Sequence, residues 1–470
     1  MIADVDILKR IACLVGDKEF VYDSNTEKWL TYNDVWIRAY TIAGYFRQQG
    51  MKTVIAVMKN GIELFTLYFA CMLSGTVVIP IDPQKSPTEI DSIISEHGDA
   101  VILKDESEIF ALHNTYASVD AINKAIRQID LNKLFMITYT SGSTGHAKGV
   151  MHNLRNLFLT AKSFGEATGL NDRFTMGHVM PMTYMAGILN TIVMPFWCGT
   201  KIVLLPRFDV MSAIKFWKNS EKLHVNAFWL APTMLNLLMT IDKKAKAKEY
   251  LSSVDTRFYI GTAPLLESTR QKFEEKYGVK LLQSYGLSET LFISTELPED
   301  ENDFNSVGKL LPEVQIDTSC HDEIRIDVPW MFLGYSNENT SDYFEDNKYK
   351  SGDLGKVDNQ NRLYITGRIK DLIVKGGMNI SPTQIEKSLT RYEQISECAV
   401  AGVMVKEEEN IACWYVLKKD LELSHVEVNN LLEKELGRHC RIDFFRQIKE
   451  IPKNLNGKID KKKLVREFTL

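Results

Sequence analysis

The sequence predicts an α/β fold: a large N-terminal domain of helix-covered, mostly parallel sheets, followed by a small, mobile α+β domain. The length of 470 residues, 45% of them hydrophobic, exceeds what a single core normally serves. Short β-branched runs alternate with helical patterns, which is typical of parallel sheets covered by helices. This pattern changes after residue 364, where a Gly-punctuated, strand-like segment begins. We therefore expect two domains, residues 1–369 and 370–470, with the boundary near Lys370.

The individual elements follow from local patterns. Residues 53–60 have the apolar, β-branched composition of a strand, residues 61–75 that of a buried helix, and residues 76–83 that of a second strand. The strand pattern recurs in three later runs, 201–208, 225–232 and 256–264.

Three short segments are expected to follow the last strands: 231–232, 261–264 and 283–286. Because α/β folds collect ligands at the carboxyl ends of strands, we expect a ligand site there. Residues 363–382 have the pattern of strands joined by glycine turns. Helices are expected to follow over 383–392 and 426–440, and the tail after residue 452 is basic.

Composition excludes several classes of protein. A net charge of −5 and a pI near 6.1 give no electrostatic reason to expect nucleic acid as the main partner. The first ten residues lack the pattern of a secretory signal. Two uncharged stretches, 64–81 and 174–200, reach membrane-spanning length, but Gly and Pro interrupt both, so buried helices and strands joined by turns are expected. Seven scattered cysteines without a C-x-x-C pair indicate reduced thiols. We expect a cytoplasmic protein without a membrane span.

The stretch YTSGSTGHAKGV, residues 139–150, combines hydroxyl and glycine residues with one lysine directly after an apolar run. Backbone N–H groups of such a loop can converge on an anion, and Lys148 adds a positive charge. The stretch does not fit the Walker pattern, because Gly149 follows the lysine. Polyphosphate is the ligand that this chemistry favours, although such a loop taken alone is equally compatible with a flexible turn.

Six blocks together resemble the adenylate-forming enzymes, which include acyl-CoA synthetases, peptide-synthetase adenylation domains and firefly luciferase. They are YTSGSTGHAKGV (139–150), GTAPL (261–265), SYGLSET (284–290), YKSGDLG (349–355), GRIKDLIVKGGMNISPTQIE (367–386) and PKNLNGKID (452–460). The blocks occur in the family's order over more than 300 residues. The resemblance implies that a carboxylic acid is activated with ATP as acyl-AMP, with release of pyrophosphate, and is then transferred to a thiol.

The resemblance also implies roles for individual residues. Those around the ATP phosphates are Thr140, Ser141, Gly142, Ser143, Thr144, Gly145 and Lys148. Those around the adenine and ribose are Thr262, Ala263, Pro264, Ser284, Tyr285, Asp353 and Arg368. Ser288 would reach the α-phosphate. Glu289, with Thr144 nearby, would bind Mg²⁺, whose hard charge suits carboxylate and phosphate oxygens.

Catalysis in this family implies a moving C-terminal domain. Lys458 resembles the family's catalytic lysine, and a lysine on a small terminal domain can act only when that domain closes over the ATP site. The resemblance places the hinge at Lys370. Rotation would then remove Lys458 and bring in Gly376 and Gly377, which leave room for a pantetheine arm because they have no side chains. A simple turn is the alternative interpretation of this glycine pair.

The acid and the thiol acceptor are less closely defined. Tyr184, Met185, Trp229 and Gly261 are candidate walls of the acyl pocket, with plain core packing as the alternative. Tyr184 stands where many acyl-CoA synthetases carry His, and its block lacks the Asp that binds an amino group, so an apolar fatty, branched or aryl acid is favoured. CoA is the expected acceptor.

Other partners and functions stay open. A free-standing carrier protein with phosphopantetheine, docked on residues 453–465, is the alternative acceptor. Residues 315–335 are shorter than the family's usual loop before its Gly-Tyr element, and this departure is expected to affect the edge of the large domain. A nucleotide-binding regulatory protein and a phosphotransferase are two further alternatives.

Overall fold

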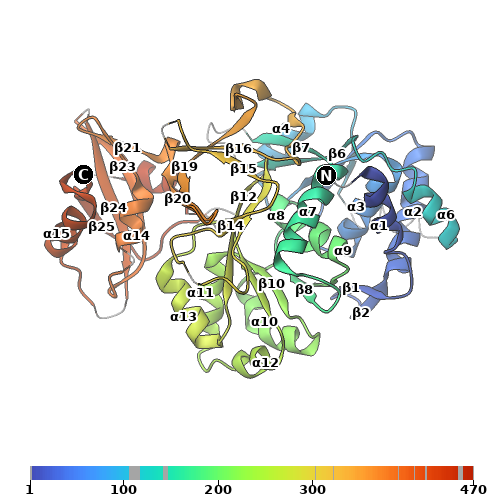
Figure 1. Ribbon diagram of the computed structural model, residues 1–470, viewed down its shortest axis with the longest axis horizontal. Coiled ribbons are helices and arrows are strands. Elements are labelled where there is room, and N and C mark those ends of the chain that lie inside the picture. Colours follow the sequence, from blue (N-terminus) through green and yellow to red (C-terminus); the bar gives the residue numbers. More distant parts are fainter. Residues whose placement is uncertain are drawn as a thin grey trace.

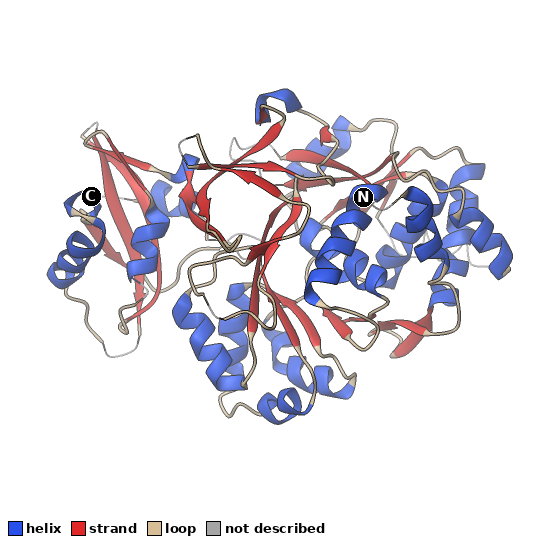
Figure 2. Ribbon diagram, in the orientation of Figure 1, coloured by secondary structure: helices blue, strands red, loops and turns tan. Residues whose placement is uncertain are grey.

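The computed structural model describes residues 3–104, 117–140, 147–301, 303–320, 322–389, 391–406, 408–418, 421–453 and 459–468. Its architecture confirms the predicted α/β fold (Figure 1, Figure 2). Three sheets with their helices make up most of the molecule, and the C-terminal part, orange to red, lies at the left of Figure 1. No helix among the described residues is long and apolar enough to cross a membrane.

The first sheet has six strands in the order β17-β7-β6-β4-β3-β5. They are β3 (Thr53–Val57), β4 (Val77–Ile81), β5 (Val101–Leu103), β6 (Leu134–Thr140), β7 (Lys148–Asn153) and β17 (Gly334–Tyr335). Strands β3, β4, β5 and β6 pair in parallel, whereas β7 and β17 add antiparallel pairs. The hairpin β6–β7 pairs Thr140 with Lys148, so the glycine- and hydroxyl-rich segment connects these two strands.

Helices cover both faces of this sheet. Alternate residues of a strand point to opposite faces. Val54 and Ala56 of β3 therefore join one core cluster, whereas Ile55 and Val57 join another with Ile93 of α4 (Pro87–Glu96). The helices of the first cluster include α1 (Asp4–Ala12), α2 (Tyr32–Gln48), α3 (Ile62–Ser74), α6 (Val119–Ile126) and α7 (Leu154–Thr168). Because both faces of the sheet are buried, the sequence of β3 from Val54 to Val57 is apolar throughout and does not alternate with polar residues.

The second sheet has nine strands in the order β14-β13-β12-β11-β10-β8-β9-β1-β2. They are β1 (Glu19–Asp23), β2 (Lys28–Thr31), β8 (Thr175–His178), β9 (Lys201–Leu204), β10 (Ala227–Leu230), β11 (Arg257–Ile260), β12 (Leu281–Leu287), β13 (Leu291–Thr295) and β14 (Lys309–Leu310). The centre of this sheet is parallel.

This sheet also separates two cores. Trp229 of β10 packs on Phe164 of α7, with ring centroids 5.5 Å apart. The next residue on either side, Phe228 or Leu230, faces a cluster formed with the helices at the bottom of Figure 1. Those helices are α10 (Val210–Lys222), α11 (Pro232–Ile241), α12 (Ala247–Ser253) and α13 (Glu267–Tyr277).

The third sheet is antiparallel and lies between the C-terminal part and the rest of the molecule (Figure 1). Its strands are β15 (Gln315–Asp317), β16 (Glu323–Asp327), β18 (Phe344–Glu345), β19 (Lys348–Val357) and β20 (Leu363–Arg368). A 3-10 turn, η2 (Thr340–Tyr343), precedes β18, and a second, η3 (Ile369–Asp371), follows β20.

The chain after η3 has its own buried cluster, whose members run from Ile373 to Ile442. A hairpin of β21 (Ile373–Lys375) and β22 (Met378–Ile380) comes first, and a three-stranded sheet of β23 (Ile395–Val405), β24 (Glu408–Leu417) and β25 (Phe444–Gln447) follows. The helices are α14 (Pro382–Leu389), α15 (His425–Leu436), the 3-10 turn η4 (Arg438–Cys440) and α16 (Lys461–Arg466).

Two sequence-based predictions about where secondary-structure elements end are wrong. Residues 283–286 lie inside β12, because this strand leaves β11 after Gln283 and continues as the antiparallel partner of β13. Gly187 and Pro195 lie within a continuous helical segment and not in turns. The segment consists of α8 (Met185–Ile188), the π-helical turn η1 (Leu189–Val193) and α9 (Met194–Cys198). Pro195 is the second residue of α9, next to the π-helical turn, where the regular hydrogen-bond ladder is already interrupted.

Candidate nucleotide and acid site

Asp353 connects three of the sequence blocks. Its carboxylate accepts a hydrogen bond from the Tyr285 hydroxyl at 2.7 Å and forms an ion pair with Nε of Arg368 at 2.6 Å. Asp353 is 1% exposed and pairs with Arg368 across the β19–β20 hairpin. A carboxylate has about four acceptor positions, so two remain for a ligand. Partial burial disfavours the charged guanidinium, but Asp353, together with Tyr285 and Asp371, more than offsets this, so the pKa of Arg368 is raised.

Glu289 lies at the centre of a second group, in the turn after β12. The Tyr335 hydroxyl donates a hydrogen bond to Oε1 of Glu289 at 2.7 Å and lies 3.0 Å from the Tyr349 hydroxyl. Burial, together with the charge of Glu289, raises the pKa of Tyr335 far above its ordinary value. Tyr335 therefore stays a neutral donor and orients the Glu289 carboxylate.

The same two strand regions carry both groups. Tyr285 precedes Glu289 by four residues, and Tyr349 precedes Asp353 by four residues on β19. Tyr349 and Asp353 both lie in β19, and four residues of a regular strand extend about 13 Å. The arrangement thus places the buried Asp353 carboxylate at one end and the half-buried Glu289 carboxylate at the other end of an elongated site.

Lys148, the first residue of β7, lies beside the second group. Its ammonium is 2.8 Å from Oε2 of Glu338 and also contacts the Tyr343 hydroxyl. The ammonium lies 5.2 Å from the centre of the Tyr335 ring and 4.1 Å from that of Tyr343. Burial lowers the pKa of Lys148, but the contacts with Glu338 and Tyr343 outweigh this, so that its pKa is above the ordinary value.

A buried histidine, His152, holds the backbone of Ser288. Nε2 of His152 donates to the Ser288 carbonyl at 2.7 Å. Burial lowers the pKa of His152 to about 4, although the Ser288 carbonyl opposes this shift. His152 is therefore neutral near pH 7 and carries its proton on Nε2. It fixes the backbone immediately before Glu289.

The GTAPL block follows β11 and carries polar atoms suited to a ligand. Thr262 has a φ of 69°, a left-handed conformation that is uncommon for a residue with a branched side chain. Its hydroxyl is buried and has no hydrogen-bond partner among the described residues, as is true of Nε1 of Trp229. Such a backbone outlier beside unsatisfied polar atoms is typical of a ligand site. Ala263 and Pro264 follow Thr262 in the same loop.

Gly261 and Ser284 adjoin this block. A Cβ on Gly261 would lie 3.4 Å from the Trp229 ring and 3.5 Å from the Ser284 carbonyl, so little space remains between these residues. The Ser284 hydroxyl is hydrogen-bonded to Thr295 at 2.9 Å. Its backbone, and not its hydroxyl, therefore adjoins Gly261.

Two side chains hold the loop that leads to Tyr184 and Met185: one follows β3 and the other lies on α3. The Asn60 side chain donates to the Met180 carbonyl at 2.7 Å and accepts from the Met182 N–H at 2.8 Å. The Tyr68 hydroxyl donates to the Met182 carbonyl at 2.6 Å. Tyr184 then precedes α8, in which Met185 is buried. The backbone of this loop is thus fixed independently of the side chain at position 184.

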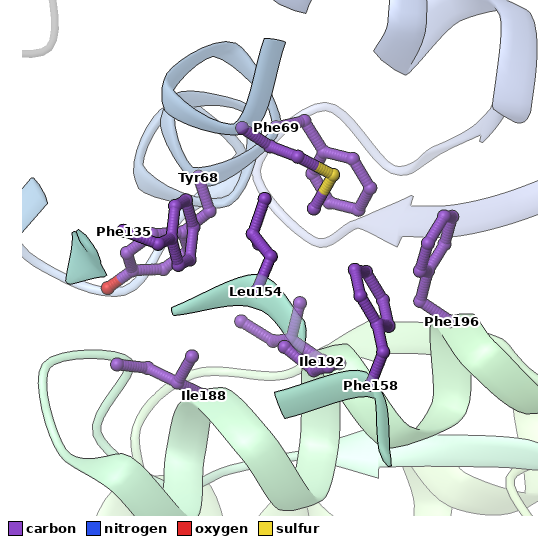
Figure 3. A pocket seen from close by; sticks show the side chains of 10 residues that line it. Tyr68, Phe69, Phe135, Leu154, Phe158, Ile188, Ile192 and Phe196 are labelled. Atoms are coloured by element: carbon purple, nitrogen blue, oxygen red, sulfur yellow. The ribbon is translucent and has the colours of Figure 1, made fainter. Parts of the chain in front are cut away.

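A small apolar cavity lies beside the helical segment that follows Tyr184 (Figure 3). Its volume is about 20 Å³, which is room for one water-sized group and not for an acyl chain. Side chains of α3, β6, α7 and the helical segment α8–α9 surround it: Tyr68, Phe69, Met72, Phe135, Leu154, Phe158, Ile188, Ile192, Val193 and Phe196. None of Asp353, Glu289, Lys148 and Thr262 lines this cavity.

Three predicted residues of the C-terminal part are described. Lys370 lies in η3 with much of its surface exposed, and partial desolvation of its ammonium together with the positive charge of Arg368 lowers its pKa. Gly376 and Gly377 form the turn of the β21–β22 hairpin with φ of 58° and 77°, and no atom lies within 4 Å of a Cβ at either position. The left-handed backbone alone explains glycine at both positions, and the open space is compatible with an approaching ligand.

The structure leaves part of the predicted site undescribed. Thr140 is the last residue of β6. The predicted phosphate-loop residues Ser141, Gly142, Ser143, Thr144 and Gly145, and the predicted catalytic residue Lys458, lie outside the described residues. Within the described ranges, no group of three or more His, Cys, Asp and Glu side chains is placed to hold a metal ion. A cation at Glu289 would need further oxygen atoms besides this carboxylate.

Sequence reasoning did not single out several residues that contact the predicted ones. Segment 315–335 supplies the edge strand β15, and its last residue, Tyr335, contacts Glu289. Glu338 and Tyr343 lie shortly after this segment and contact Lys148. The Gly-Tyr pair was the available signal, but its pairing with β7 depends on tertiary structure.

Comparison with known proteins adds to this geometry. A family model described as AMP-binding enzyme matches residues 9–318, and the model of the AMP-binding enzyme C-terminal domain matches residues 384–458. A 2-succinylbenzoate–CoA ligase of Bacillus licheniformis is 27% identical and covers 97% of this chain and 98% of its own. A long-chain-fatty-acid–CoA ligase of Mycobacterium tuberculosis is 25% identical, with 88% of each chain covered. The crystal structure of ATP-bound MatB from Rhodopseudomonas palustris has a TM-score of 0.84 at 23% identity, covers 99% of each chain, and shares the fold.

Proposed function

The chain belongs to the family of AMP-binding enzymes, and from this premise we propose that it is an ATP-dependent acid–thiol ligase. It would activate a carboxylic acid as acyl-AMP and transfer the acyl group to CoA. The observation that carries this proposal is the buried Asp353, on which Tyr285 and Arg368 converge from two other sequence blocks. A buried carboxylate with free acceptor positions suits the two hydroxyl groups of a ribose.

The adenine would lie against the loop after β11. Thr262, Ala263 and Pro264 supply its walls in this proposal, with Ser284 and Tyr285 opposite. The unpartnered Thr262 hydroxyl supports this assignment, because a bound base or ribose can satisfy it. Asp353 would hold the ribose at one end of the site, and Arg368 would lie near the ribose and the α-phosphate.

The triphosphate would extend from Asp353 toward Glu289 and Lys148. Lys148 and the segment from Thr140 to Gly145 would surround the β- and γ-phosphates, and Ser288 would lie near the α-phosphate. Glu289 fits a Mg²⁺ ligand, because its bond to Tyr335 leaves acceptor positions free and Mg²⁺ usually takes its other oxygens from phosphates and water. Bound there with Thr144, Mg²⁺ would supply positive charge next to the phosphates.

The chemistry then requires two steps. A carboxylate oxygen of the acid attacks the α-phosphorus, and the bond to the β-phosphate breaks as pyrophosphate leaves. Lys458 would contact the acid and the α-phosphate in this step. In the second step a thiol attacks the acyl carbon, and the bond from this carbon to AMP breaks. We propose that residues 370–470 rotate about Lys370 between the steps and bring Gly376 and Gly377 to the pantetheine.

The acid would be apolar, with Tyr184, Met185, Trp229 and Gly261 around it. The short loop around Tyr184 is held by Asn60 and Tyr68 through its backbone, which leaves its side chains to determine the shape of the pocket. The relatives named above are CoA ligases, which supports CoA as the acceptor. A carrier protein with phosphopantetheine is the alternative, because it presents the same thiol.

Pyrophosphate release tests the proposal. The protein is incubated with ATP and Mg²⁺ and a panel of acetic, medium-chain, branched, aryl and amino acids, and the products are analysed by mass spectrometry after CoA is added. Acid-dependent pyrophosphate together with an acyl-CoA is the expected result. Acyl-AMP without thioester would favour the carrier protein, and absence of pyrophosphate with every acid would contradict the assignment.

A further inference from the structure

We propose that Glu338 competes with polyphosphate for Lys148 and thereby sets the affinity of the site for ATP and for pyrophosphate. This inference rests on the proposed function, because it takes Lys148 to be a phosphate ligand. It concerns a residue whose block was not among those that predict the site. The evidence is the position of Glu338, the manner in which the backbone holds it there, and the partners that it shares with Lys148.

Glu338 takes the place at Lys148 that a phosphate oxygen would need. Its Oε2 atom lies 2.8 Å from Nζ, which is the distance of a charge-assisted hydrogen bond. The Tyr343 hydroxyl donates to the same Oε2 atom and accepts from Nζ, so the three groups form a closed ring of contacts. The side chain of Lys148 is 12% exposed and that of Glu338 25%. The charge of Lys148 is thus neutralised within the protein before any ligand binds.

The backbone around Glu338 is fixed to the strand that carries Lys148. The Asn337 side chain accepts from the Gly149 N–H at 3.2 Å and donates to the Ala147 carbonyl at 2.9 Å, so it contacts the backbone on both sides of Lys148. The Ser336 N–H donates to the Gly149 carbonyl at 2.8 Å. A Cβ on Gly149 would overlap the Ser336 hydroxyl, which explains glycine at this position. The backbone of both residues is therefore ordered independently of the ion pair, and only side-chain entropy is lost when the pair forms.

This arrangement has opposite effects on binding and on release. A phosphate group that reaches Lys148 must displace the Glu338 carboxylate or tolerate it as a like charge nearby, and either one weakens binding. When pyrophosphate leaves, Glu338 can return to Lys148 and the original ion pair is restored. Glu338 thus lowers the affinity of the site for the product as well as for the substrate.

Calorimetric titration with inorganic pyrophosphate and, separately, with adenosine tests the competition. Glu338→Gln keeps the shape of the side chain and removes its charge. We expect this variant to bind pyrophosphate about tenfold more tightly than the wild type, equivalent to about 1.4 kcal/mol, and adenosine equally well. The pyrophosphate concentration that half-inhibits the reaction of this variant should also be about tenfold lower than that for the wild type. Glu345→Gln is the matched control, because Glu345 lies shortly after Glu338 in the sequence but pairs with Arg325 at 3.0 Å. This variant should bind both ligands as the wild type does.

The titrations separate the competition from the proposed function. Unchanged or weaker pyrophosphate binding by Glu338→Gln, with adenosine binding retained, would overturn the competition. Failure of the wild type to bind either adenosine or pyrophosphate would instead contradict the proposed function, and the competition with it. Glu338→Asp provides a second variant: it keeps the charge but is shorter by one methylene, so it should bind pyrophosphate with an affinity between those of the wild type and Glu338→Gln.

Discussion

Replacement of Asp353 by asparagine should abolish the preference for a ribose with both hydroxyl groups. The Asp353 carboxylate accepts from Tyr285 at 2.7 Å and from Arg368 at 2.6 Å, and in our proposal its remaining acceptor positions bind the ribose. A hydrogen bond to a charged group contributes about 1.5 to 3 kcal/mol. Asparagine keeps one acceptor oxygen but lacks the charge. We therefore expect a loss of about 2 to 3 kcal/mol in adenosine binding, or roughly 30- to 150-fold in Kd.

The free energy of unfolding should change much less. The Arg368 side chain is 42% exposed, so water can replace part of the lost ion pair, and we expect a loss of about 1 kcal/mol. Asp358 is the matched control. It lies on the same hairpin and accepts from Arg362 at 2.8 Å and from Tyr364 at 3.1 Å, which reproduces the Asp-Arg-Tyr chemistry. Asp358→Asn should cost similar stability and leave adenosine binding unchanged.

Titration calorimetry with adenosine and 2′,3′-dideoxyadenosine measures the effect. The wild type should bind adenosine more tightly, and Asp353→Asn should bind the two ligands nearly equally. Wild-type affinity of Asp353→Asn for adenosine would refute the reasoning, and so would an equal loss in Asp358→Asn, because the effect would then not be specific to the position of Asp353.

Three further predictions concern the rest of the molecule. Tyr335→Phe removes the donor that orients Glu289, so the Mg²⁺ concentration for half-maximal pyrophosphate release should rise about tenfold, while adenosine binding stays unchanged. Because the pKa of His152 is about 4 in the folded chain, against 6.5 ordinarily, the unfolded chain binds more protons between these values. The free energy of unfolding should therefore fall by about 3 kcal/mol as the pH decreases from 6.5 to 4, and His152→Gln should flatten this slope in denaturant titrations. Gly377→Phe should lower the thioester yield from supplied acyl-AMP, whereas Gly376→Asn, which tolerates a left-handed backbone, should retain the fold and indicate any effect of strain alone.

The parallel sheets could be predicted because their strands are buried on both faces. Residues such as Val54 and Ile55 point to different cores, so the sequence of β3 is continuously apolar and contrasts with the helices around it. The antiparallel sheet could not be recognised in this way. Its longest strand, β19, contains lysines, glycines and Asp353, and is partly exposed, so neither composition nor alternation marks it.

The site divides along a similar line. Asp353, Glu289 and Lys148 could be proposed from local blocks, because each block combines residue types that serve one ligand. Tyr335 and Glu338 could not, because their importance arises only when β17 pairs with β7 and brings them beside Lys148. A lone carboxylate in a polar segment carries no signal of that pairing. The π-helical turn η1 likewise has no pattern that separates it from an ordinary buried helix.

The β19–β20 hairpin has a mechanical consequence. Arg368, which grips Asp353, ends β20, and Lys370 lies only two residues further in the 3-10 turn. Only two peptide units separate Arg368 from Lys370, and no loop lies between them. A rotation of the chain about Lys370 would therefore also move Arg368. A ligand bound to Asp353 would restrict the movement of the segment from Arg368 to Lys370. In the proposed rotation about Lys370, ligand binding at Asp353 and the movement of the residues after 370 would therefore be coupled through the backbone.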